Sequence, residues 1–303
     1  MSAAPARSPG KLTPGRRVGW LATVVATVVA TGLVAATVAT GSCMPPSWGA
    51  AAFLHPRRRA VKTEGVPAHR EVMIPSGEVM LRGWLFPGRL PRRGLIVYLH
   101  GLGDNRLSGV GVAQRYGQLG WDVLTYDQRA HGESDGAACT YGYYEKHDLG
   151  RALDVLGVNR AVVMGSSLGG SVALQAAAVD PRIVAVIAQS PFADLERIAR
   201  ERAPFFASED NIRSAMRLAE REASFHIAGV SPVRDAAKIQ VPVLLLHGQK
   251  DKVIVPAHSQ ALTAALPAPH ELVLLPAADH DSVLTYEESW TAITRLLDKV
   301  PVG

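Results

Sequence analysis

The pentapeptide Gly165–Gly169 reads G-x-S-x-G, with Ser167 at its centre, and is the first pattern here that could do chemistry. It follows a β-branched apolar run and opens an amphipathic helix pattern over Leu168–Val179, so it falls at a strand-to-helix turn. We expect strained backbone angles there, with no room for a side chain at position 165 or 169. Such a turn raises the hydroxyl above the sheet edge, beside a helix N-terminus whose dipole favours developing negative charge. The pattern predicts a nucleophile, and its alternative is a Gly/Ser-rich loop without catalysis.

A serine hydroxyl needs a general base and a group that orients that base. Around a nucleophile on such a turn, the expected chain order is serine, acid, histidine. Asp251 follows the apolar run Val241–Leu246, and His280 follows the apolar run Leu272–Leu275. We therefore expect His280 to take the proton from Ser167 and return it to the leaving group. Asp251 would hold the imidazole ring and stabilise its charged form.

Both assignments have alternatives elsewhere in the chain. Asp194 follows the preceding apolar run and could be the acid in a variant arrangement. His247, at a strand end before a glycine, is interpreted as structural. Asp279 and Asp281 flank His280, but neighbours in the sequence project in different directions. His258 and His270 precede the last predicted strand or lie at its wrong end.

An oxyanion hole for acyl transfer needs two backbone N–H groups. One is expected from Leu168, directly after the nucleophile, and the other from the loop His100–Asp104. Leu102 is the predicted donor in that loop, where the glycines let the backbone approach a substrate closely. His100 is interpreted as a structural hydrogen-bonding residue.

Short apolar runs alternate with helix-like stretches and supply the frame for these residues. The runs have strand length and do not alternate, which favours strands buried on both faces of a parallel sheet. With a hairpin over Glu71–Phe86, this predicts an α/β fold with a mostly parallel eight-stranded sheet, helices on both faces and function at the carboxyl ends of the strands. The remaining strands are expected at Leu95–Leu99, Val123–Tyr126, Ala161–Met164, Ile183–Ala188, Val241–Leu246 and Leu272–Leu275, and the helices at Gly109–Leu119, Tyr144–Leu156, Leu168–Val179, Pro256–Leu266 and Glu287–Lys299.

One connection is much longer than the others. About 50 residues separate Ala188 from Val241, with helical patterns at Leu195–Arg202 and Asp210–Phe225. A long insertion over the carboxyl edge of a sheet is typical of a lid, here about residues 191–240. The alternative is additional helical packing without a gating role.

The chain begins with a basic stretch, residues 1–17, and continues with an apolar one. Val18–Gly41 is 24 residues without Lys, Arg, Asp or Glu. As a helix it would be about 36 Å long, against about 30 Å for the hydrocarbon core of a bilayer. The apolar region of a cleavable signal peptide is only about 7–15 residues. We therefore interpret residues 18–41 as a transmembrane signal anchor, residues 42–65 as a linker and residues 66–303 as the catalytic domain.

The orientation of this anchor follows from the flanking charges. Arg16 and Arg17 directly precede it, which favours a cytoplasmic N-terminus and an extracytoplasmic domain. The basic cluster at 57–62 weakens that assignment and could lie against anionic lipid headgroups. Cys43 lies in a segment that resembles a bacterial lipoprotein attachment site, so lipid attachment there is the alternative to the anchor.

Composition excludes several classes of protein. Of 303 residues, 48% are hydrophobic and 19% charged, which excludes disorder over most of the chain, and two cysteines cannot make a disulfide scaffold. Residues 1–70 hold nine basic residues and one acidic residue, whereas residues 71–303 hold 23 basic and 26 acidic residues. The basicity therefore belongs to the N-terminal arm, which argues against a nucleic-acid surface on the domain. No phosphate-loop, dinucleotide or zinc-ligand motif is found, so we expect no cofactor and no metal.

These motifs together resemble the α/β-hydrolase superfamily over about residues 66–300. The similarity is greatest to membrane-anchored, serine-peptidase-like hydrolases of the serine aminopeptidase S33 type. One departure is Gln128–Ala130, where Arg-Gly is usual, in a segment interpreted as structural. The matching segments are His100-Gly101, Asp127–Ser134, Gly165–Gly169, the Asp251 loop, His280, Phe53–Pro56 and Ser190–Phe192.

The resemblance implies ester, thioester or amide hydrolysis without a cofactor. We expect a serine hydrolase that cleaves carboxylic ester or thioester bonds through an acyl-enzyme, on a small-molecule or lipid-like acyl substrate. The alternatives are a serine peptidase of the same fold and a non-catalytic binding protein of that fold. The sequence identifies neither the substrate nor the oligomeric state, because this fold hosts many functions.

Overall fold

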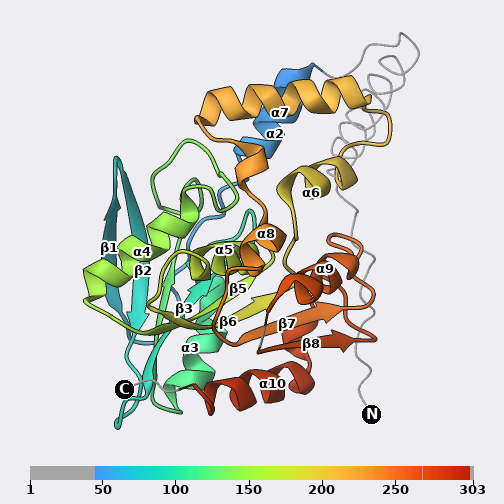
Figure 1. Ribbon diagram of the computed structural model, residues 1–303. Helices are drawn as coiled ribbons and strands as arrows, with labels where there is room; N and C mark the ends of the chain where they lie inside the picture. The colour runs from blue at the N-terminus through green and yellow to red at the C-terminus, as the bar shows by residue number, and fades with distance from the viewer. Residues whose placement is uncertain (1–44, 268, 301–303) are drawn as a thin grey trace, which may run out of the picture.

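The computed structural model describes residues 45–267 and 269–300, and an eight-stranded sheet forms its centre (Figure 1). The strand order is β1-β2-β4-β3-β5-β6-β7-β8; β1 and β2 pair antiparallel with their neighbours and all other pairs are parallel. The mostly parallel eight-stranded sheet predicted from the sequence is therefore confirmed. Its strands are β1 (Arg70–Ser76), β2 (Val79–Phe86), β3 (Gly94–Leu99), β4 (Trp121–Tyr126), β5 (Ala161–Ser166), β6 (Ile183–Gln189), β7 (Val243–Gly248) and β8 (His270–Leu275).

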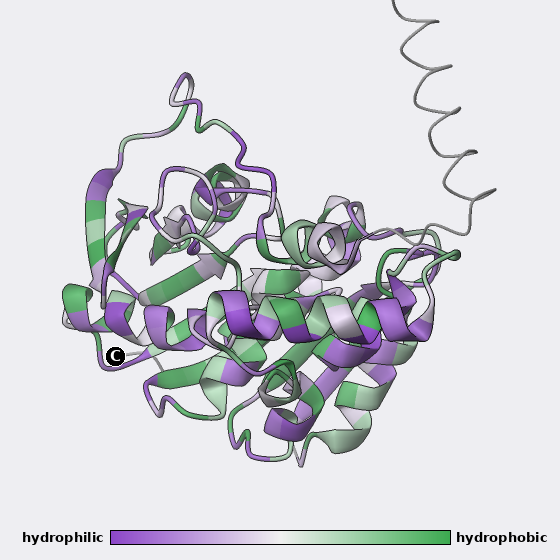
Figure 2. Ribbon diagram, turned by 90° about the horizontal axis from the view of Figure 1, so that it is seen from above, coloured by the Kyte–Doolittle hydropathy of each residue, from purple (hydrophilic) through white to green (hydrophobic). Residues whose placement is uncertain are grey.

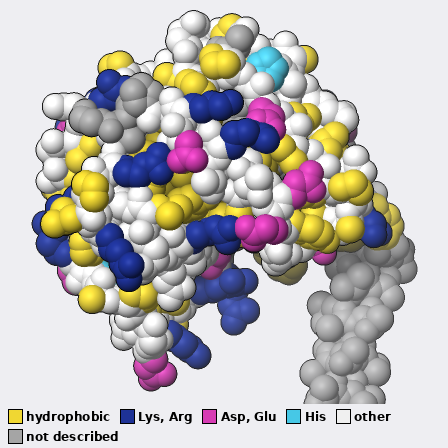
Figure 3. Space-filling model, turned by 90° about the horizontal axis from the view of Figure 1, so that it is seen from below, with side chains coloured by type: hydrophobic (Ala, Val, Ile, Leu, Met, Phe, Trp, Pro, Cys, Tyr) yellow, Lys and Arg dark blue, Asp and Glu magenta, His cyan; other side chains and the backbone are white. Residues whose placement is uncertain are grey.

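Helices cover both faces of the sheet, as the apolar runs without alternation required. One core cluster packs the sheet against α4 (Glu145–Leu156), α5 (Leu168–Ala177) and α9 (Ala257–Ala265), and the other packs it against α3 (Val110–Gly117) and α10 (Glu287–Leu297). Seen from above, the strands are largely hydrophobic, while the helices mix both kinds of residue (Figure 2). The face seen from below mingles acidic and basic side chains (Figure 3).

The long connection after β6 contains the helices expected there. They are α6 (Leu195–Glu201) and α7 (Glu209–Ala223), followed by the short α8 (Pro232–Ala236). In Figure 1, α7 lies at the top of the molecule, beyond the carboxyl ends of the strands, with α6 between it and the sheet. The connection is therefore placed where a lid would be; its mobility stays a prediction.

Part of the segment predicted as a linker, residues 42–65, is a helix instead. Helix α2 (Pro46–Leu54) packs along α7, and Ala50 and Leu54 are buried (Figure 1). The two helices approach closely at Gly49, where an added Cβ would come within 2.9 Å of Ala215 Cβ. The linker interpretation thus fails for residues 46–54, because α2 has no polar face that would mark it as an amphipathic helix. We call α2, α6, α7 and the loop between α6 and α7 the cap.

The predictions for the N-terminal arm concern residues that the structure does not describe. These are the basic stretch 1–17, the signal anchor 18–41 and the lipid-attachment alternative at Cys43. Within residues 45–267 and 269–300, no helix combines the length and apolar character needed to cross a bilayer.

The packing of α2 can be tested by truncating Leu54 to alanine. Leu54 is fully buried in the larger core cluster, so Leu54→Ala should lower the free energy of unfolding by about 2–5 kcal/mol. The matched control is Leu119→Ala, where the leucine is 46% exposed and the change should stay within about 0.5 kcal/mol. Urea denaturation of both variants checks this, and equal, small losses would contradict the packed helix.

Candidate active site

Ser167 lies on a strained turn between β5 and α5. Its backbone has φ 53° and ψ −113°, a positive φ that a residue with a side chain rarely adopts. The Ser167 N–H donates to Gln189 O on β6 over 2.7 Å, which holds this conformation. An added Cβ at Gly165 would lie 2.2 Å from the Gly169 backbone, and one at Gly169 would lie 2.1 Å from Leu99 O. The turn therefore has the strain and the need for glycine that were expected.

Ser167, His280 and Asp251 form one hydrogen-bonded chain. His280 Nε2 lies 3.0 Å from Ser167 Oγ, and His280 Nδ1 lies 2.7 Å from Asp251 Oδ2. Because an ionised carboxylate only accepts, Nδ1 carries the proton and Nε2 is free to accept from the serine hydroxyl. The structure thus brings the three predicted side chains together, and their catalytic roles stay a prediction.

Asp251 is surrounded by donors. Its Oδ1 accepts from the N–H groups of Val253 and Ile254 over 2.8 and 2.9 Å. Burial alone would raise the pKa of this carboxyl, but hydrogen bonds from His247, His280 and the Ile254 N–H outweigh burial and hold the pKa well below its ordinary value. Asp251 is therefore ionised over the whole neutral range, as a group that stabilises imidazolium must be.

The rival candidates are engaged elsewhere. Asp194 caps α6 by accepting from the Arg197 N–H, and Asp279 accepts from the N–H and hydroxyl of Ser282. His258, buried in α9, and His270, at the start of β8, are not in this chain of hydrogen bonds. Asp281 lines the cavity beside the site without taking the place of Asp251.

His247 contacts the Asp251 carboxylate from within the core. Its Nε2 lies 2.8 Å from Ile254 O and 3.3 Å from Asp251 Oδ2, while its Nδ1 lies 2.6 Å from Ser259 Oγ. The ring is fully buried, so the structural interpretation of this histidine is confirmed.

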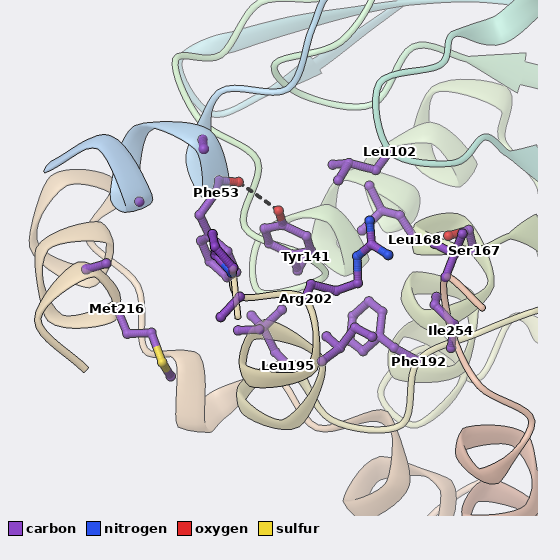
Figure 4. Close-up of a pocket in the computed structure, with 18 of the residues that line it drawn as sticks. Phe53, Leu102, Tyr141, Ser167, Leu168, Phe192, Leu195, Arg202, Met216 and Ile254 are labelled. Carbon is purple, nitrogen blue, oxygen red and sulfur yellow. Dashed lines mark hydrogen bonds between the residues drawn. The ribbon is translucent and has the colours of Figure 1, made fainter. Parts of the chain in front are cut away.

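The two predicted oxyanion donors border the same cavity as Ser167. Leu168 is the first residue of α5, where a helix leaves its N–H groups without an intrahelical partner. Leu102 lies in the turn closed by the hydrogen bond from Asp104 N–H to Gly101 O. Both side chains lie on the same side of Ser167 in Figure 4. Their role as donors stays a prediction.

His100 fixes the loop that carries Leu102. Its Nε2 accepts from the Gln128 N–H over 3.0 Å, and its Nδ1 donates to Gly101 O over 2.8 Å. Gln128 in turn donates to His100 O over 2.7 Å. His100 and Gln128, the residue at which the sequence differs from the family pattern, therefore hold this loop together. Burial lowers the pKa of His100 to about 4, so the ring stays neutral.

A cavity of about 750 Å³ opens between the Ser167 turn and the cap (Figure 4). Its lining is mainly apolar and comes from α2, α6 and α7 as well as from the loops at the sheet edge. Tyr141 borders it and donates from its hydroxyl to Phe53 O over 2.7 Å. Sequence analysis did not point to Phe53 and Tyr141 as pocket residues, nor to Arg202, which directly follows helix α6.

Among the residues that the structure describes, no three His, Cys, Asp or Glu side chains gather in a way that could hold a metal ion.

Comparisons with known proteins agree with this architecture. A family model described as the alpha/beta hydrolase fold matches residues 94–211, and one described as serine aminopeptidase S33 matches residues 222–287. The Pyrococcus furiosus esterase Pf2001 is similar in structure, with a TM-score of 0.66 and 22% identity over 81% of this chain and 99% of that one. Mouse alpha/beta hydrolase domain-containing protein 10 has a TM-score of 0.58 and 23% identity over 76% of this chain and 99% of that one. At this level of identity, the likeness concerns the fold.

Curated relatives are similar in sequence over part of their length. YqkD of Bacillus subtilis is 30% identical over 195 residues, which are 61% of this chain and 64% of that protein. The 2,6-dihydropseudooxynicotine hydrolase of Paenarthrobacter nicotinovorans is 27% identical over 246 residues, 76% of this chain and 61% of that protein. The similarity thus spans less than two thirds of either relative.

The tight turn predicts a sharp response to a single methyl group at Gly169. Gly169→Ala drives Cβ into the Leu99 carbonyl and should lower the free energy of unfolding by about 1–3 kcal/mol. The control is Gly111→Ala on α3, where nothing lies within 4 Å of the added Cβ and no loss is expected. Thermal and urea unfolding compare the two, and equal stability would refute the close approach.

The buried neutral ring of His100 predicts a pH-dependent stability. The unfolded chain protonates this residue below about pH 6.5, whereas the folded chain does so only near its pKa of about 4. As the pH drops from about 6.5 to about 4, the free energy of unfolding should therefore decrease, by up to about 3 kcal/mol from this residue. His100→Gln should make the dependence shallower over that window, and His270→Gln, an exposed control, should not. Urea midpoints from pH 4 to 7 measure the slope; parallel profiles would refute the assignment.

Proposed function

Because the chain belongs to the α/β-hydrolase superfamily, we propose that it is a serine hydrolase that cleaves carboxylic ester or thioester bonds through an acyl-enzyme. The observation that carries this proposal is the hydrogen-bonded chain from Ser167 through His280 to Asp251 at the wall of a largely apolar cavity. An activated serine beside an apolar cavity suits transfer of an acyl group to water.

In the acylation step, Ser167 Oγ attacks the carbonyl carbon while its proton passes to His280 Nε2. The carbonyl oxygen becomes an oxyanion, which the N–H groups of Leu102 and Leu168 would stabilise. Asp251 stays ionised and offsets the positive charge on the imidazolium. As the bond to the leaving alcohol or thiol breaks, the imidazolium returns its proton to that group, and the acyl-serine remains.

Deacylation repeats the sequence with water. His280 takes one proton from a water molecule, whose oxygen attacks the acyl carbon, and then returns the proton to Ser167 Oγ as the ester bond breaks. The products are the carboxylic acid and the free enzyme. Neither step calls for a metal or a redox cofactor.

The apolar lining supports an acyl substrate, either a small molecule or a lipid-like one. Ile198, Ile212 and Met216 of the cap face the cavity together with Phe192 from the core. Relatives bear names that fit hydrolysis, namely an esterase and a hydrolase. These names support hydrolysis in general, and the specificity for ester or thioester bonds is our proposal.

A serine peptidase is the second candidate. It is favoured by the match of residues 222–287 to the serine aminopeptidase model and by Asp281, a carboxylate on the cavity wall that could accept a substrate amine. The mainly apolar lining favours the esterase. Parallel assays with p-nitrophenyl esters, thioesters and aminoacyl p-nitroanilides would separate the two.

The decisive variant is Ser167→Ala. It should reduce ester turnover by about 10⁶-fold, because loss of the nucleophile removes the covalent route. A fluorophosphonate probe should label the wild type at Ser167, as located by peptide mapping, and should not label the variant. Ser76→Ala is the control, since this serine at the end of β1 donates to Asp148 and does not line the cavity, so its loss should leave labelling intact.

Turnover by Ser167→Ala close to the wild-type rate would refute the proposed nucleophile. A folded wild type that neither takes the probe nor turns over any ester would favour the remaining alternative, a non-catalytic binding protein with this fold.

A further inference from the structure

Two arginines line the cavity, Arg59 and Arg202, and of these only Arg202 has no acidic partner among the described residues. We propose that Arg202 makes the cavity selective for esters whose apolar chain ends in a carboxylate. This inference rests on the proposed hydrolase function and specifies its substrate class.

Arg202 is placed to reach a bound substrate. It follows the last residue of α6 and lines the same cavity as Ser167 and Leu168. In Figure 4, its side chain runs from α6 into the cavity, with the guanidinium directed to the side where Leu168 and Ser167 lie. An acyl chain that fills the cavity from Ser167 would therefore pass within reach of this group.

The guanidinium of Arg202 has no acidic partner, unlike three other arginines of the cap. Arg197 pairs with Glu201 over 2.8 Å, Arg200 with Glu196 over 2.6 Å, and Arg213 with Glu209 over 3.4 Å. Among the described residues, the Arg202 side chain makes neither a hydrogen bond nor an ion pair. Arg217 and Arg221 of α7 also lack an acidic partner among the described residues, but they do not line the cavity, whereas Arg202 does.

The backbone that carries Arg202 is anchored to the core. Its N–H donates to Ile198 O over 2.9 Å, and the preceding Glu201 accepts from His258 Nε2 over 2.7 Å. His258 is buried in α9, and its Nδ1 accepts from the Ala193 N–H. The C-terminal end of α6 is therefore tied to the α/β core at the base of the Arg202 side chain. A cation presented from a fixed backbone loses less entropy when it binds an anion.

The other charged groups of the cavity do not compete for this role. Arg59 lies 3.6 Å from Asp104, so these two charges offset each other. Asp281 directly follows His280 on the loop after β8, whereas Arg202 belongs to the cap. The lining between the nucleophile and the cap is apolar. An apolar chain with a terminal carboxylate matches this arrangement, since the planar guanidinium can bind both carboxylate oxygens at once.

The experiment compares two esters of equal chain length, p-nitrophenyl octanoate and mono-p-nitrophenyl suberate, which carries a terminal carboxylate. In Arg202→Met, kcat/KM for the suberate ester should fall by about tenfold to a hundredfold, the usual effect of losing a charge-assisted hydrogen bond. The octanoate ester should change by no more than about twofold. Arg202→Lys keeps the charge without the planar fork and should recover part of the loss.

The matched control is Arg221→Met on α7. Arg221 is exposed and does not line the cavity, so both esters should be turned over as by the wild type. An equal loss for the two esters in Arg202→Met would mean that the residue only supports the cap, and no loss for either would mean that it plays no part. Both results would overturn the proposal.

A binding measurement separates this proposal from the proposed function. Calorimetric titration of monomethyl suberate into Ser167→Ala and into Ser167→Ala/Arg202→Met needs no turnover. The double variant should bind about tenfold or more weakly, whereas neutral dimethyl suberate should bind both equally. If no ester is hydrolysed by the wild type but this difference is found, the hydrolase proposal fails and the carboxylate site stands. Equal affinities refute the site itself.

Discussion

The close contact between the Ser167 turn and the neighbouring backbone is the constraint on which the rest of the site depends. Gly165 and Gly169 allow β5, β3 and α5 to meet with no side chain between them, and the Gln189 carbonyl holds Ser167 in its positive-φ conformation. Strain of this kind persists only where the surroundings over-determine it. The parallel strands supply that support, because β3, β5 and β6 are buried on both faces and end at the same edge.

Histidine and aspartate reach the serine through the order of the sheet. β6, β7 and β8 lie side by side, so the loops after β7 and β8 end next to the turn after β5. Besides His280, the groups that fix Asp251 are the N–H groups of its own loop and the buried ring of His247. Hydrogen bonds thus hold the site in place on the sheet side, and the cap forms its other wall.

Much of the fold and the three central residues of the site could be predicted from sequence, because each carries a local signal. Buried parallel strands appear as short apolar runs, and Ser167, Asp251 and His280 each follow one. Helix α2 could not be predicted, since it owes its existence to packing on α7 some 160 residues later. The same holds for Arg202, whose significance depends on which neighbouring arginines have acidic partners, a fact that only tertiary structure supplies.

The pairing of α2 with α7 has a consequence for how the protein is made. One wall of the cavity unites residues 46–54 with residues 209–223, and the last member of the hydrogen-bonded chain, His280, comes near the end of the chain. During synthesis, α2 therefore cannot pack on α7 until the strands from β1 to β6 have been synthesised. A nascent or truncated polypeptide that lacks residues 209–280 would present Ser167 without His280 and without the α7 wall of the cavity. The cavity wall and the hydrogen-bonded chain are therefore both complete only after residue 280 has been synthesised.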